Sequence, residues 1–226
     1  MWEELNQLHF ALVRPSRAPR GETFHRMVRD RLQYFQGLAD CTLAHDEPWQ
    51  FITLGQYLER AFQVAGLLRR QAHLLATTEG DEDDLVKWLA VLRSCGSAEA
   101  YARFYTLRVE PARIVEFLVL NPVFPQSIRY ALNTASTALA AIAALRQAAG
   151  NDPGPAPRTL GRVRALVEHG AVDEVFEAGV AEFLERVRRS VEQVAEEVTA
   201  TYLRDQPSTG KLLGVARATQ LMAEQQ

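Results

Sequence analysis

Hydrophobic residues recur along most of the chain at spacings of three and four, which is the period of an amphipathic α-helix. The alternation of apolar and polar residues that marks a β-strand is nowhere convincing. The pattern therefore predicts an all-α protein, folded as an antiparallel bundle of roughly seven to nine helices. The expected helices lie at about residues 2–12, 22–43, 47–76, 81–92, 97–105, 111–120, 125–148, 160–167 and 172–202.

Glycine and proline gather at one place between the expected helices. Residues 150–157 read GNDPGPAP, a composition that suits an exposed, extended linker. We expect a single helical domain over residues 1–206 that contains this linker. The small and polar segment 207–226 is expected to form a mobile tail.

One expected helix is almost free of charge. Between Trp49 and Leu68 the sequence contains only two charged residues, Glu59 and Arg60, which predicts a buried helix. Because the two are adjacent, their side chains diverge by about 100 degrees and cannot pair with each other. An unpaired buried charge costs several kcal/mol. We therefore expect Glu59 to pair with Arg129, and Arg60 to meet an acid or the carbonyl groups of a helix C-terminus.

Two glycines lie on the same side of this helix as Glu59. Gly55 and Gly66 predict that a neighbouring backbone approaches closely there, because glycine in a helix interior costs roughly 1 kcal/mol relative to alanine. The charges have two interpretations. One is an internal salt-bridge network that fixes the register of the helices. The other is a cleft for a polar ligand, lined by Glu59, Arg60, Tyr57 and Arg129.

The composition of the 226 residues is that of an ordinary folded protein, with 47% hydrophobic and 23% charged residues. A formal net charge of -3 gives no field that attracts nucleic acid or an anionic membrane, so neither is expected as a partner. No apolar run approaches the ~18 residues that a membrane span requires. Acidic residues near the N-terminus, together with the unpaired spacing of Cys41 and Cys95, indicate a reducing, cytoplasmic location.

Motifs for catalysis and metal binding are absent from the sequence. The histidines are scattered, and no HExxH, paired-cysteine or EF-hand spacing occurs, so no metal and no cofactor is expected. No GxSxG element occurs, and neither cysteine has a local catalytic signature. These residues leave open whether the chain is an enzyme.

Two stretches resemble the alpha-E domain family, all-helical bacterial proteins with a Glu-Arg motif. They are DEPWQFITLGQYLERA at residues 46–61 and FLVLNPVFPQSIRYAL at residues 117–132, and a similar connector lies between them. The two motifs add Trp49 and Ser127 to the candidate site. The chain departs from the family at Gln56, where an arginine is usual. It also carries one clear copy of the motif and resembles the C-terminal half of longer members, which implies either a homodimer or a reduced member.

The resemblance implies a helical accessory or binding subunit that acts with an ATP-grasp-type amide-forming ligase and a transglutaminase-like protein. One alternative is an enzyme component, in which Glu59 acts as general acid or base and Arg60 or Arg129 holds an anionic or peptide-like substrate. The other alternative is a purely structural interaction protein. Fold-level analogy cannot choose among these, because function resides in the site.

Overall fold

The structure is a computed structural model that describes residues 21–72, 82–105, 109–169 and 179–203. All regular secondary structure within these ranges is helical, which confirms the all-α prediction. The expected helix at residues 2–12 and the expected tail at 207–226 lie outside the described residues. The chain divides into two compact units, residues 1–50 and 51–226, with the boundary inside one helix.

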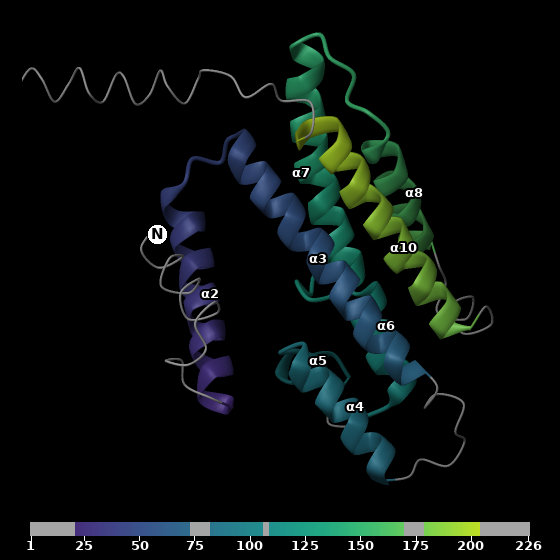
Figure 1. Cartoon of the computed structure of the whole chain (residues 1–226). Helices are drawn as coiled ribbons and strands as arrows, with labels where there is room; N and C mark the ends of the chain where they lie inside the picture. The colour runs from purple at the N-terminus through teal and green to yellow at the C-terminus, as the bar shows by residue number, and fades with distance from the viewer. Residues whose placement is uncertain (1–20, 73–81, 106–108, 170–178, 204–226) are drawn as a thin grey trace, which may run out of the picture. The chain divides into compact units, whose positions relative to one another are not determined.

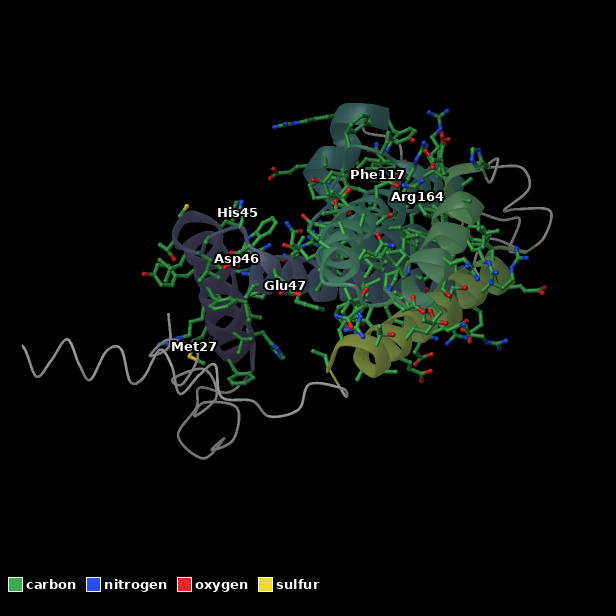
Figure 2. The ribbon with its side chains drawn as sticks, turned by 90° about the horizontal axis from the view of Figure 1, so that it is seen from above. Met27, His45, Asp46, Glu47, Phe117 and Arg164 are labelled. Carbon is green, nitrogen blue, oxygen red and sulfur yellow. The ribbon has the colours of Figure 1, made fainter. Side chains whose placement is uncertain are left out.

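The first unit contains α2 (Glu22–Thr42) and the first turn of α3. His45 lies in the short connection between these two helices (Figure 2). The imidazole of His45 stacks on the indole ring of Trp49, with the ring centres 4.0 Å apart. The predicted site residue Trp49 is therefore a packing residue of this connection.

The second unit holds the remaining helices. They are α3 (Glu47–Gln71, from residue 51 onward), α4 (Glu82–Ser94), α5 (Ala98–Tyr105), α6 (Pro111–Leu120), α7 (Ile128–Ala148), α8 (Ala156–His169), α10 (Val180–Val198) and the π-helical turn η2 (Thr199–Leu203). The helices α7, α8 and α10 run side by side (Figure 1). A short loop makes α7 and α8 antiparallel, and the end of α10 returns to that same loop.

Apolar stripes at helical spacing form the core of the second unit. The inward positions of α7 are almost completely buried: Ile128, Leu132, Ala135, Leu139 and Ile142. On α10 the buried stripe comprises Phe183, Val187, Val191, Val194 and Val198. Full burial of one such large apolar side chain contributes about 1.5–3 kcal/mol before entropy is counted, so these stripes determine how the helices face one another.

The α7–α8 loop is shorter than the predicted linker and is held in place. It ends at Pro155, because α8 already begins at the buried Ala156. The hydroxyl of Tyr202 donates to the carbonyl of Pro153 at 2.8 Å. The guanidinium of Arg146 lies 5.1 Å from the centre of the Tyr202 ring. These contacts hold the loop between the end of α7 and η2.

A carboxylate surrounded by arginines joins α3 to α10. Glu185 of α10 lies 3.3 Å from Nε of Arg69 on α3, and it also contacts Arg188 and Arg189 at 3.1 and 3.2 Å. Partial desolvation alone would raise the pKa of Glu185. The hydrogen bond from Arg189 and the charges of the other two guanidiniums outweigh it and hold that pKa below its ordinary value.

The same contact explains one glycine of α3 and corrects the prediction for the other. A Cβ at Gly66 would lie 3.4 Å from Nε of Arg188, whose guanidinium covers the ring of Phe62 at 4.3 Å. Gly66 therefore admits a side chain from α10, not the backbone that the sequence predicted. A Cβ at Gly55 would meet no atom within 4 Å, so no close helix approach occurs there among the described residues.

The contact predicts an acid-sensitive component of stability. Because the folded pKa of Glu185 is depressed, its contribution is complete above the unfolded value of about 4.3 and disappears as pH falls through the folded value. We expect Glu185→Gln to flatten the fall of the free energy of unfolding below about pH 5, measured by urea denaturation across pH. Glu182→Gln on the same helix should leave the wild-type slope unchanged. A Glu185→Gln profile parallel to wild type would contradict this role.

The loop predicts a difference between two glycines. Gly150 and Gly154 both have positive φ, 78° and 74°, but a Cβ at Gly154 would lie 2.5 Å from Oγ1 of Thr201, whereas the space around Gly150 is open. We expect Gly150→Ala to lower the free energy of unfolding by about 1–2 kcal/mol through backbone strain alone. Gly154→Ala should cost at least about 1 kcal/mol more through the overlap. Equal losses in urea denaturation would show that the loop does not rest on η2.

Candidate functional site

Three elements of the second unit surround a cleft of about 380 Å³, namely α3, the end of α4 and the loop between α6 and α7. Its polar lining consists of Gln56, Glu59, Arg60, Gln63, Arg70, Ser94 and Gln126. Val64, Leu67 and Cys95 supply the apolar surface. The volume falls near the lower end of the roughly 300–1,000 Å³ that ligand pockets occupy. The cleft therefore suits a small ligand.

The position of the cleft follows from the helical period of α3. The buried stripe of this helix consists of Leu54, Leu58, Ala61, Ala65 and Leu68. The cleft residues of α3 recur at the same spacing but are shifted by about half a turn, which places them on the opposite side of the helix. Burial of the first stripe therefore turns the second stripe outward into the cleft.

Two contacts hold the guanidinium of Arg60 in the cleft. Its Nη1 donates to the carbonyl oxygen of Pro125 at 3.2 Å, and its guanidinium lies 4.6 Å from the centre of the Tyr57 ring. Cation–π contacts of this kind contribute about 0.5–1 kcal/mol at exposed sites and more when desolvated. A carbonyl partner was expected, but it comes from the loop before α7 and not from a helix C-terminus.

Tyr57 lies three residues before Arg60 on α3, and its ring contacts the Arg60 guanidinium. Burial raises the pKa of the Tyr57 phenol, although the guanidinium of Arg60 opposes this shift. The ring also packs against Tyr130 of α7, with the ring centres 5.9 Å apart. Because its phenol stays protonated at neutral pH, Tyr57 serves as a neutral platform that orients Arg60.

The loop between α6 and α7 is fixed by its own hydrogen bonds. The side chain of Asn121 accepts two backbone N–H groups of the loop, each at 2.9 Å. The buried Ser127 caps α7 by accepting the N–H of Tyr130 at 3.1 Å, and its hydroxyl donates to the carbonyl of Asn121. These bonds position the carbonyl of Pro125 and the side chain of Gln126 beside α3.

The structure contradicts the prediction that Glu59 is buried and paired with Arg129. Glu59 is exposed, and its Oε1 accepts a hydrogen bond from Nε2 of Gln63 at 2.6 Å. Arg129 instead forms an ion pair with Glu168 of α8 at 3.5 Å. The predicted pair of Glu59 with Arg129 is therefore wrong, and so is the burial of Glu59. Arg129 belongs to the contact between α7 and α8.

A helix with few charges can still expose one side to solvent. The α3 helix is poor in charge because glutamines and a glycine occupy its outer side, including the exposed Gly55 and Gln63 and the half-buried Gln56. Glutamine is uncharged but well solvated, so a helix that carries it on one face remains amphipathic. The adjacent Glu59 and Arg60 lie on this outer side, where the cleft begins.

The thiol and hydroxyl at the end of α4 are poor nucleophiles as placed. Burial raises the pKa of the Cys95 thiol to about 11, so at neutral pH it carries its proton. The hydroxyl of Ser94 donates to the carbonyl of Ala90 at 2.8 Å. The lining residues contain no histidine to act as a base for either group. The polar side chains of the lining can offer charge and hydrogen bonds to a ligand, and Glu59 is the carboxylate among them.

In the part of the chain that the structure describes, no three histidine, cysteine, aspartate or glutamate side chains lie close enough together to hold a metal ion. None of the helices in that part has the length and apolar character needed to span a membrane.

Sequence reasoning missed most of the lining. Gln56 lies three residues before Glu59, and Gln63 and Arg70 lie four and eleven residues after it, so a polar stripe at helical spacing was the available signal. Ser94 and Gln126 reach the cleft only through tertiary packing, because α4 and the loop before α7 lie far from α3 in the sequence. No local pattern marks residues of that kind.

The fold and the cleft together define a class, an all-helical protein with a polar cleft built on a helix that carries an adjacent Glu-Arg pair. The Alpha-E family, described as "a predicted alpha-helical domain with a conserved ER motif", matches residues 1–203. The chain belongs to the Alpha-E family. No curated protein and no solved structure matches it.

The geometry predicts unequal losses of stability when the two members of the Glu-Arg pair are substituted. Glu59→Gln changes an exposed group and should alter the free energy of unfolding by less than about 0.5 kcal/mol. Arg60→Gln removes both the bond to Pro125 and the contact with Tyr57, and should cost about 1–2 kcal/mol. Urea denaturation at neutral pH measures both. A Glu59→Gln loss as large as that of Arg60→Gln would contradict the exposed position of Glu59.

Proposed function

We propose that this protein is a helical binding subunit that holds a short peptide-like ligand in the α3 cleft and acts with an ATP-grasp-type amide-forming ligase. The observation that carries the proposal is the composition of the cleft. A carboxylate, guanidiniums and carboxamides face one space of about 380 Å³. The partner enzyme is proposed from membership of the Alpha-E family and from the association that the resemblance implies.

The lining matches the groups of a short peptide. The guanidiniums of Arg60 and Arg70 suit a terminal carboxylate, because their N–H groups pair with both of its oxygens. The carboxylate of Glu59 suits a terminal ammonium. Carboxamides both donate and accept hydrogen bonds, so Gln63 and Gln126 suit the peptide group between these ends.

The dimensions of the polar stripe agree with such a ligand. Gln56 and Arg70 are fourteen residues apart on α3, which corresponds to about 21 Å along the helix axis. An extended peptide spans at most about 3.6 Å per residue. The two ends of a dipeptide or tripeptide are therefore closer together than the two ends of the stripe. The portion of the stripe from Glu59 to Arg70 is long enough to contact both ends of such a peptide.

Calorimetric titration with three related ligands tests the binding. The probes are alanyl-glutamine, its N-acetylated form and its C-terminal amide. Loss of either terminal charge should weaken binding about tenfold or more, because hydrogen bonds to charged groups contribute about 1.5–3 kcal/mol. Glu59→Gln should bind the free and N-acetylated peptides equally. Arg60→Gln should bind the free peptide and its C-terminal amide equally. Arg158→Gln on α8 is the matched control and should behave as wild type.

The proposed partnership is tested with the ATP-grasp ligase from the same source. Adding the wild-type chain should raise ADP release by the ligase in the presence of its peptide substrate, whereas the Glu59→Gln and Arg60→Gln chains should not. Peptide binding that ignores both terminal charges would contradict the proposed cleft. Turnover of substrate by this chain alone would contradict the accessory role.

A further inference from the structure

The outer face of α10 separates its charges along the helix. Five charged side chains lie on this exposed stripe, in the order Glu182, Arg186, Arg189, Glu192 and Glu196. Positive charge therefore lies near the middle of α10, at Arg186 and Arg189, and the C-terminal half beyond it carries the negative charges of Glu192 and Glu196. Seen from above, the yellow-green α10 lies at the rim of the second unit's helices, with a row of side chains pointing outward (Figure 2).

Most of these charged side chains have no ion-pair partner among the described residues. Arg189 pairs with Glu185 one turn away at 3.2 Å. Arg186, Glu192 and Glu196 have no ion-pair partner in the described part of the chain. In addition, Oε2 of Glu197 is buried there without a hydrogen-bond partner. Carboxylate oxygens near the end of α10 can therefore accept hydrogen bonds from a cationic side chain of another molecule.

The acidic half of α10 is also hollowed. A depression of about 610 Å³ is lined by Glu192, Glu196, Glu197 and the small residues Ala195, Thr199 and Ala200. Small side chains at a helix surface allow another helix to approach closely. The depression therefore combines negative charge with room for long cationic side chains.

We infer that α10 is a self-association surface, on which two copies of this chain pack antiparallel through their outer faces. With a two-fold axis near residue 191, Arg186 of each copy faces Glu196 of the other, and Arg189 faces Glu192 or Gln193. The arginines of one copy then enter the acidic depression of the other. Because the contact is isologous, each pair occurs twice.

Charge complementarity selects this occupant and this direction. A parallel arrangement would place arginine against arginine and glutamate against glutamate, and like-charge juxtaposition across an interface is strongly unfavourable. Antiparallel packing also opposes the dipoles of the two helices. Exposed ion pairs are individually weak and are screened by salt. The dimer should therefore dissociate in the micromolar range and be sensitive to ionic strength.

Sedimentation equilibrium of the full chain at low and at ~1 M salt tests the inference. The wild type should dimerise at low salt and weaken at least about tenfold at high salt. Arg186→Glu and Glu196→Arg should each weaken the dimer by at least about tenfold, because each creates a like-charge pair. The double variant restores opposite charges in the swapped sense and should recover the wild-type dissociation constant to within about threefold.

Arg158→Glu on α8 makes the same charge change on another exposed helix and should leave the dimer unchanged. Circular dichroism establishes that each variant is folded. A chain that stays monomeric at low salt would overturn the inference. So would single variants that match the Arg158→Glu control, or a double variant that is weaker than either single variant.

Discussion

The apolar stripe of α3 is the constraint on which the candidate site depends. Leu54, Leu58 and Leu68 belong to the core of the second unit, which also contains buried side chains of α7 and α10. An α-helix cannot rotate to expose such a stripe without losing about 1.5–3 kcal/mol for each large side chain. Its burial therefore fixes the outward direction of the opposite side, which carries Glu59 and Arg60.

Arg60 connects this constraint to the chemistry. Its contacts with Tyr57 and with the carbonyl of Pro125 link α3 to the loop before α7. That loop is in turn held by Ser127 and Asn121. The guanidinium consequently reaches the cleft in a preset orientation, so a ligand would not bear the full entropy of ordering it. Glu59, by contrast, remains exposed and adaptable.

The sequence predicted the helices well because the apolar period of three and four is a local property. It also located Glu59 and Arg60 as the charged focus of α3. The partner predicted for Glu59 was wrong. Arg129 pairs with Glu168 and not with Glu59, because α8 packs against α7. Tertiary packing also hid Ser94 and Gln126, which approach α3 only in the folded chain. The glutamines of α3 were visible in the sequence, but their lack of charge was read as burial.

We propose that a peptide-like ligand enters the α3 cleft and contacts its carboxamides. The most direct measurement is the nuclear magnetic resonance of the glutamine side-chain NH₂ groups during titration with alanyl-glutamine. We expect progressive shifts for Gln56, Gln63 and Gln126, with Gln147 and Gln193 unchanged. Shifts confined to glutamines outside the cleft, or no shift at millimolar peptide, would contradict it.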